Sequence, residues 1–367
     1  MKKMNYLTSI RGIAAVIVIL YHVKSSLLAH QFSSSLSFIY ANGYLAVDLF
    51  LILSGFIICL KYSEIYQDRI SQKDFFSFMA KRFARVFPLH AFIMISFLVI
   101  PLVIAVSGRP IPDNFGLEKF FIKLFMIDLW THQEYFWNSW NTPSWSISGE
   151  FLAYLIFPFL AFAIHNLSIG MKIILYIFLL FLIAFIYEIN NSLSLGDNIS
   201  SLGLLRCTIG FSLGMFICYF YKEILKTKTN FSGFAKIAFV ILTFIFILLS
   251  YNFSKNHYFA PACFSLFLFL ILLFNSPMHQ FLESRVLVYI GDISYSLYLN
   301  HILVLYVLTM IFLENNEKAG YGFILSYLLI TVLVSSLTYK MVEIPARGWL
   351  CAKLAIIPKL QTRSKNA

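Results

Sequence analysis

Long runs of apolar residues recur along the whole chain and are separated by short polar stretches. A helix needs about 20 apolar residues to cross the roughly 30 Å hydrocarbon core of a bilayer. The pattern therefore predicts an all-α polytopic membrane protein with about ten transmembrane helices. The predicted spans are residues 10–28, 44–60, 87–107, 149–165, 172–188, 202–221, 235–251, 258–275, 288–312 and 321–342.

The composition favours the same class of protein and excludes several others. Of the 367 residues, 60% are hydrophobic and only 12% are charged, and the mean hydropathy is +0.79. A soluble domain is about half apolar and a quarter charged, so this chain is neither a disordered segment nor a nucleic-acid-binding module. Its five cysteines are scattered, with no pair at metal-ligand spacing, and we expect neither disulfides nor a metal site.

The net charge of +11 is unevenly placed along the chain. If the N-terminus is cytoplasmic, 20 of the 28 Lys and Arg residues fall on the inner side and six on the outer side, while Arg11 and Arg206 lie within spans. Cytoplasmic loops are enriched in positive residues. The sequence therefore predicts that both termini are cytoplasmic. The excess of basic residues is expected to lie on the cytoplasmic side of the lipid bilayer, and no nucleic acid is expected as a partner. We expect one transmembrane domain over residues 1–348, a short basic cytoplasmic tail over 349–367 and no fused second soluble domain.

The longest stretch between spans, residues 108–148, has apolar residues at helical spacing. Lys119 and Lys123 stand between them. This pattern is typical of an amphipathic helix that lies at the membrane interface, over the bundle. The apolar positions are Phe115, Phe120, Phe121, Leu124, Phe125 and Leu129.

Ionisable residues inside spans are costly, so each is a candidate for function. Arg11 and His22 share the first span, and at 100° per residue their eleven-residue separation puts them on one helix face, about 16 Å apart along the axis. Asp48 and Glu150 each begin a span that enters from the outer side. The inner end of the third span carries Arg82 and Arg85. The expected arrangement has two levels, with arginines below and a histidine with carboxylates above.

This arrangement suits an acyl donor with phosphate groups at one end and a thioester at the other. Guanidinium groups bind phosphates and stay charged when desolvated. A histidine held by a carboxylate is suited to general base catalysis. Acetyl-CoA has the required shape, and its transfer reaction needs no metal. Taken singly, these residues also fit lipid-phosphate contact, packing or topology, and a transporter with the same charges is the alternative function.

Six segments, in order along nearly the whole chain, resemble the signatures of acyltransferase family 3, a family of integral-membrane acyltransferases. Each is short, but their order is specific. They are Leu7–Gly12 followed by His22, Gly43–Phe56, Arg82–Pro88, Trp145–Phe151, Gly291–His301 and Val342–Pro345.

The resemblance implies an acyl-CoA-dependent O-acyltransferase in the bacterial cytoplasmic (inner) membrane. Such proteins modify hydroxyls of cell-surface glycans such as O-antigen, capsule, exopolysaccharide or peptidoglycan. It implies that His22 is the general base, with Glu150 orienting it, and that acetyl-CoA binds to arginines of the cationic group. An acetyl-histidine intermediate and orientation by Asp48 are open alternatives. The cationic group is Arg11, Arg82 and Arg85, and the expected acceptor-binding residues are Asp48, Trp145, Ser146, Tyr298 and His301.

Two positions depart from the family pattern. Gly149 stands where a bulkier apolar residue is common, and Asn300 stands where an aromatic residue often precedes the histidine. We expect both to affect the acceptor site rather than the type of reaction. Ser54 and Gly55 are expected to serve close helix packing. The oligomeric state is not predicted.

Overall fold

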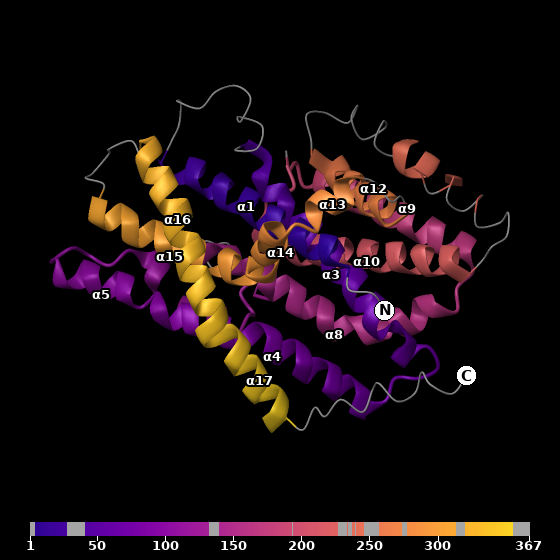
Figure 1. Cartoon of the computed structure of the whole chain (residues 1–367), viewed down its shortest axis with the longest axis horizontal. Helices are drawn as coiled ribbons and strands as arrows, with labels where there is room; N and C mark the ends of the chain where they lie inside the picture. The colour runs from indigo at the N-terminus through magenta and orange to yellow at the C-terminus, as the bar shows by residue number, and fades with distance from the viewer. Residues whose placement is uncertain are drawn as a thin grey trace.

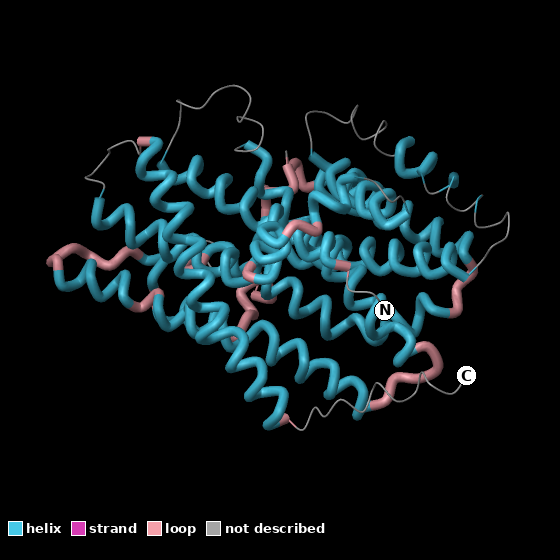
Figure 2. The backbone as a smooth tube through the Cα atoms, viewed as in Figure 1, coloured by secondary structure: helices cyan, strands magenta, loops and turns pink. Residues whose placement is uncertain are grey.

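Helices, joined by short loops and turns, make up most of the described part of the chain, and no strand occurs in it (Figure 2). We analysed a computed structural model of the whole sequence. It describes residues 4–27, 41–131, 139–192, 194–226, 233, 237–238, 240–245, 257–273, 277–312 and 320–354.

Eight helical segments are long and apolar enough to cross a membrane. This confirms the prediction of an all-α polytopic membrane protein. The predicted seventh span, 235–251, lies largely outside the described residues, and the predicted eighth corresponds to a shorter apolar helix, α12 (Ala260–Leu273). The helices of the eight segments are α1 (Asn5–Leu27), α3 (Ala46–Tyr62), α4 (Gln72–Ser96) with α5 (Val99–Val106), α8 (Trp145–His165), α9 (Ile169–Ile189), α10 (Ile199–Lys226), α15 (Ser294–Phe312) and α16 (Tyr321–Thr338) with α17 (Ile344–Lys353).

Some helices extend beyond the predicted spans. The third begins at Gln72 rather than at residue 87, because Ser71 caps it by accepting a hydrogen bond from the Asp74 N–H at 3.4 Å. The last helical segment continues beyond residue 342, where the predicted span ends. It runs through a π-helical turn, Tyr339–Glu343, into α17 and ends at Lys353, beyond the predicted domain end at residue 348. Hydropathy locates the apolar middle of a helix, whereas caps and tertiary contacts set its ends.

The predicted ninth span is broken in two. A short helix, α14 (Arg285–Asp292), precedes α15, with Ile293 between them. At the break Gly291 packs against Gly12 of α1, where an added Cβ on Gly12 would lie 2.6 Å from the Gly291 nitrogen. The two backbones can approach this closely only because both positions lack side chains.

At the centre of the bundle α3 packs along α10 (Figure 1). A Cβ added to Gly55 would collide with the Phe211 carbonyl oxygen, and one added to Gly214 would collide with that of Ile52. Gly55 therefore serves close packing, as expected. Gly149 is explained in the same way, since its added Cβ would overlap Cys207 of α10.

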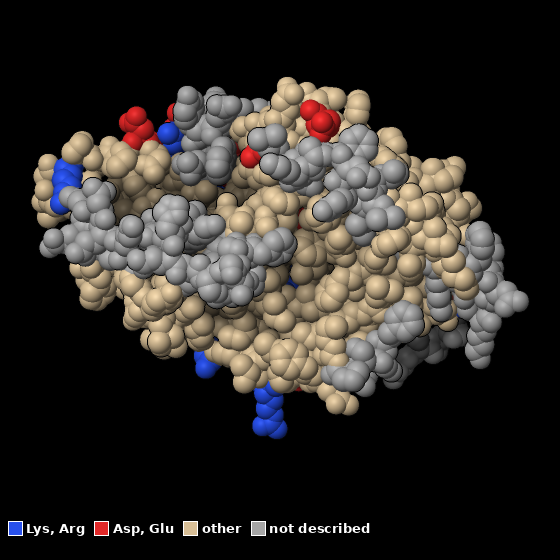
Figure 3. Space-filling model, turned by 90° about the horizontal axis from the view of Figure 1, so that it is seen from above, with Lys and Arg blue, Asp and Glu red and all other residues tan. Residues whose placement is uncertain are grey.

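The outside of the described bundle is apolar. Figure 3 shows one face on which Lys, Arg, Asp and Glu are few and lie mainly near the margins. On α9 the large side chains point outward, with exposed fractions between 44% and 62% for Ile174, Phe178, Phe181 and Phe185. A surface of this kind fits contact with lipid tails.

The stretch 108–148 contains a short helix, α6 (Leu117–Leu124), which exposes Phe121 and buries Lys123, while Lys119 is half-buried. The Lys123 ammonium pairs with Asp128 at 3.0 Å. Periodicity gave no sign of this burial, because the partner of Lys123 lies outside the helix.

Candidate active site

A cavity lies between α1, α3, α4, α8 and α15, with an empty volume of about 860 Å³ that includes open solvent at its mouth. Six predicted site residues line it, contributed by four of these helices. They are Arg11, Arg82, Arg85, Ser146, Glu150 and Tyr298.

The three arginines have different partners. Arg85 forms an ion pair with Glu343, which is buried and also accepts a hydrogen bond from Ser296 at 2.8 Å. The π-helical turn ends at Glu343, and such turns often occur at functional sites. The two residues are close in space because α17, which follows Glu343 directly, packs against α4 (Figure 1).

Arg82 and Arg11 have no carboxylate partner among the described residues. Arg82 donates to the Tyr62 hydroxyl at 3.1 Å and lies over the Tyr62 and Phe78 rings, while its Nε is buried without a hydrogen bond. Arg11 is half-buried at the cavity wall. Two guanidinium groups in this state make that part of the cavity attractive to an anion.

Glu150 belongs to the cavity and accepts a hydrogen bond from Ser54. Tyr154, one turn later on α8, is its second polar neighbour. No hydrogen bond joins Glu150 to His22 in the described part of the chain. The expected Glu150–His22 pair is therefore not what the structure brings together, and Ser54 has a polar role besides its place next to Gly55.

His22 lies against His301 of α15. The ring centroids are 4.9 Å apart, and His301 Nε2 is 3.3 Å from His22 Nδ1. His22 Nδ1 is also 2.9 Å from the Val18 carbonyl oxygen, which can only accept, so Nδ1 carries the proton and Nε2 has the lone pair. His22 thus contacts α15, whereas Arg11 lines the cavity, which α15 also borders.

Tyr298 connects the histidines with the cavity. It lines the cavity, and its ring centroid is 5.9 Å from that of His301, one turn later. Its hydroxyl lies 2.8 Å from the Ser146 hydroxyl and donates to the Pro143 carbonyl oxygen at 2.9 Å. The two predicted levels are thus contiguous.

Asp48 and Trp145 are placed elsewhere than expected. Asp48 is buried and forms a two-pronged ion pair with Arg206 of α10, with N–O distances of 2.9 and 2.7 Å. The guanidinium also lies over the Trp145 ring, 5.5 Å from its centroid. Because its carboxylate is fully engaged by Arg206, Asp48 is not the group that orients His22.

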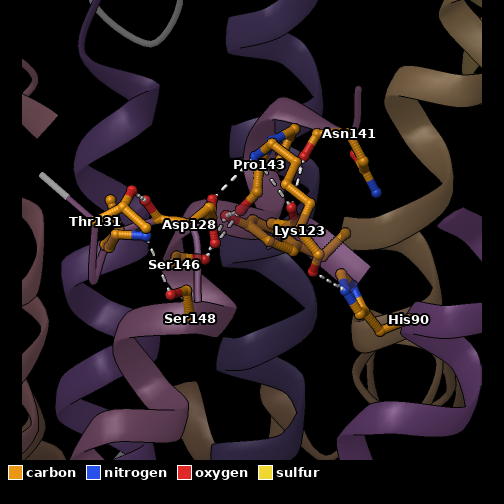
Figure 4. A network of polar contacts seen from close by, with 11 residues as sticks. His90, Lys123, Asp128, Thr131, Asn141, Pro143, Ser146 and Ser148 are labelled. Carbon is orange, nitrogen blue, oxygen red and sulfur yellow. Dashed lines mark hydrogen bonds and ion pairs between the residues drawn. The ribbon is translucent and has the colours of Figure 1, made fainter. Parts of the chain in front are cut away.

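A second buried polar network holds the outer segment on the bundle (Figure 4). Lys123 pairs with Asp128, and the Lys123 carbonyl oxygen lies 2.8 Å from His90 Nε2 of α4. Burial lowers the pKa of Lys123, and the Asp128 carboxylate opposes that shift. Asn141 donates to the Leu299 carbonyl oxygen at 3.1 Å. These contacts fix the start of α8, from which Ser146 and Glu150 reach the cavity.

Sequence reasoning missed several of these residues. Arg206 was noted within a span but not matched with Asp48, although opposite charges in two spans are a usable signal. His90 drew no attention, and Glu343 appeared only as part of a family motif. Their partners lie far away in the chain, so only the packing of the helices identifies them.

The family model for the acyltransferase domain matches residues 4–340. The chain belongs to acyltransferase family 3. The acyltransferase MdmB of Streptomyces mycarofaciens is 31% identical over 155 residues, which covers 41% of this chain and 38% of that protein. The O-acetyltransferase OatA of Staphylococcus aureus (strain MRSA252) is 26% identical over 387 residues, which covers 97% of this chain and 59% of OatA.

The present chain therefore spans less than two thirds of the length of these two relatives. A putative O-acetyltransferase, SACOL0978 of Staphylococcus aureus, is 24% identical over 94% of this chain and 58% of its own length. No solved structure gives a significant match.

Proposed function

We propose that this protein transfers an acetyl group from cytoplasmic acetyl-CoA to a hydroxyl of a cell-surface glycan, in the bacterial cytoplasmic membrane. The observation that carries the proposal is a cavity lined by two arginines without carboxylate partners among the described residues and by Tyr298. Tyr298 lies beside His301 of the His22–His301 pair, although neither histidine lines the cavity itself. The names of the relatives, acyltransferase and O-acetyltransferase, support the group transferred and the oxygen acceptor.

The phosphates of the donor bind at Arg11 and Arg82. Both are free of carboxylate partners among the described residues and can form charge-assisted hydrogen bonds with phosphate oxygens. Arg85 was expected to share this role, but its charge is balanced by Glu343. In the proposal Arg85 therefore shapes the cavity wall. The thioester extends along α1, on which Arg11 and His22 are about 16 Å apart.

His22 Nε2 removes the proton of the acceptor hydroxyl. The hydroxyl oxygen forms a bond with the thioester carbonyl carbon, the C–S bond breaks, and the thiolate takes the proton back from His22. The products are the O-acetyl ester and the free thiol of coenzyme A. The Nδ1 proton held by Val18 leaves Nε2 as the basic nitrogen, which supports this assignment. Glu150 takes part as a polar group of the cavity, beside Ser54.

The test measures thiol release from acetyl-CoA by the purified protein in detergent, with and without a crude surface-glycan extract. We expect His22→Ala to lower kcat by about 10²-fold or more, the range typical of losing a general base. Arg11→Ala should raise the KM for acetyl-CoA about tenfold, since a hydrogen bond to a charged group contributes about 1.5–3 kcal/mol. Arg109→Ala, an exposed arginine remote from the cavity, is the matched control and should leave both constants unchanged.

Failure of the wild type to consume acetyl-CoA would contradict the proposal. Movement of a glycan or anion across vesicles without acetyl-CoA would instead indicate the transporter. Full activity in His22→Ala would leave the reaction in place and remove His22 as its base.

A further inference from the structure

We propose that His301 is a positioning residue that holds His22 in the tautomer and orientation needed for base catalysis. This inference rests on the proposed function. It gives His301 a role that acts through His22, in place of the expected contact with the acceptor.

The geometry defines which nitrogen of His301 acts. His22 Nδ1 carries a proton because it lies 2.9 Å from the Val18 carbonyl oxygen. His301 Nε2 lies 3.3 Å from the same Nδ1, so it must offer its lone pair, since two N–H groups would repel. His301 is therefore neutral, with its proton on Nδ1. The Nδ1–H of His22 is shared between the carbonyl of Val18 and the ring of His301.

The His301 ring is completely buried. The backbone carbonyl of His301 accepts a hydrogen bond from the Tyr327 hydroxyl of α16 at 3.2 Å, which anchors the helix at this point. The ring Nδ1 has no hydrogen-bond partner among the described residues, so packing and the contact with His22 hold the side chain. A ring confined in this way needs little reorganisation when its partner changes charge.

The carboxylates that could have taken this role are engaged elsewhere. Asp48 is bound by both prongs of Arg206, and Glu150 is bound by Ser54. In a serine hydrolase triad, a carboxylate fixes the tautomer of the base and stabilises its imidazolium. Here a neutral histidine occupies the corresponding side of His22.

The proton inventory is simple. When His22 Nε2 takes the acceptor proton, Nδ1 keeps its own, and both N–H bonds remain on His22. His301 Nε2 accepts a stronger hydrogen bond from the imidazolium than from the neutral ring. No proton is transferred to His301, and none has to leave the site through it.

The experiment compares His301→Gln and His301→Leu with the wild type by steady-state thiol release. Glutamine keeps an oxygen that can accept the His22 Nδ1–H, whereas leucine has no acceptor. We expect His301→Leu to lower kcat about 10²-fold, which is the size of effect seen when the group that hydrogen-bonds a functional histidine is removed. The KM values for acetyl-CoA and for glycan should change less than about twofold. His301→Gln should recover at least about tenfold of that loss.

A double variant separates action through His22 from any other role. If His301 acts only through His22, then His22→Ala with His301→Leu is as slow as His22→Ala alone. His279→Gln is the matched control, because His279 is a half-buried histidine outside the cavity, bound to the Ile271 carbonyl oxygen. It should keep the wild-type kcat.

Three results would overturn the inference. Equal losses in the glutamine and leucine variants would mean that acceptance of the Nδ1–H is not the function of His301. A rise in the KM for glycan with unchanged kcat would make His301 an acceptor-binding residue. A further loss in the double variant would show a role independent of His22. If His301→Leu does not fold, His301→Phe, which also lacks a nitrogen or oxygen acceptor, takes its place in both comparisons. An inactive wild type, in contrast, would refute the proposed function itself.

Discussion

Arg82 and Arg85 illustrate how two residues one turn apart can have different functions. Both point into the cavity from α4. Arg85 is neutralised by the buried Glu343, whereas Arg82 contacts a tyrosine hydroxyl and two aromatic rings. Removing one partner of a buried ion pair leaves an uncompensated charge. The two arginines should therefore respond differently to the same substitution.

We expect Arg85→Ala to destabilise the protein by about 3–5 kcal/mol, because Glu343 would remain buried and charged. Combining Arg85→Met with Glu343→Gln should restore much of that stability. Arg82→Ala should instead raise the KM for acetyl-CoA about tenfold with little loss of stability. Thermal unfolding in detergent together with the kinetic constants distinguishes the two. Similar unfolding temperatures for Arg82→Ala and Arg85→Ala would contradict this assignment.

At the scale of helices, glycines allow the close contacts that bring the cavity walls together. Gly55 and Gly214 let α3 and α10 touch through their backbones, and Gly12 meets Gly291 where α1 crosses α14. Packing between helices in a membrane depends on such close fits, because lipid provides no hydrophobic force to drive helices together. Small residues at these crossings therefore contribute directly to the position of Arg11, Ser54 and their neighbours.

Gly214→Ala should lower the unfolding temperature and reduce the yield of folded protein, because the added methyl group meets the Ile52 carbonyl of α3. Gly170→Ala is the matched control. It is also a helical glycine, but nothing lies within 4 Å of its added Cβ, so alanine should leave stability unchanged or raise it by up to about 1 kcal/mol. Equal behaviour of the two variants would mean that this crossing tolerates a wider separation.

At the scale of the whole molecule, contacts between helix ends agree with the order of the predicted spans. Lys222 donates to Glu64 and to Ser63, both at 2.9 Å, which joins two segments assigned to the inner side. The Tyr44 hydroxyl lies 2.6 Å from His257 Nδ1, which joins two segments assigned to the outer side. These contacts group the ends, while the direction across the membrane remains a prediction from the charge distribution.

Cysteine labelling in intact cells tests that direction. An impermeant maleimide should label Ser107→Cys, an exposed position expected outside, and should leave Asp68→Cys, an exposed position expected in the cytoplasm, unlabelled until the membrane is opened. The wild type gives the background from the native cysteines, of which Cys59, Cys207 and Cys218 are buried. The reverse pattern of labelling would invert the predicted topology and place the arginines at the outer side.

The sequence by itself determined that the chain is a helical membrane protein with a few ionisable residues in its spans. Hydropathy and helical periodicity are local properties, so Arg11 and His22 could be placed on one face of one helix, and Arg82 and Glu150 could be selected as site residues. The resemblance to the family added Ser146. The same periodicity gave no sign that Lys123 is buried, because its partner Asp128 lies outside the helix.

Only the tertiary structure decided which groups pair. Asp48 meets Arg206 across 158 residues of chain, Arg85 meets Glu343 across 258, and His22 meets His301 across 279. The cost of burying a charge or a polar group favours a partner for each but does not say which one, because several candidates lie at similar depth. Helix crossings fixed by glycines bring one candidate within hydrogen-bonding distance, and this makes Glu150 a cavity residue and His301 the neighbour of His22.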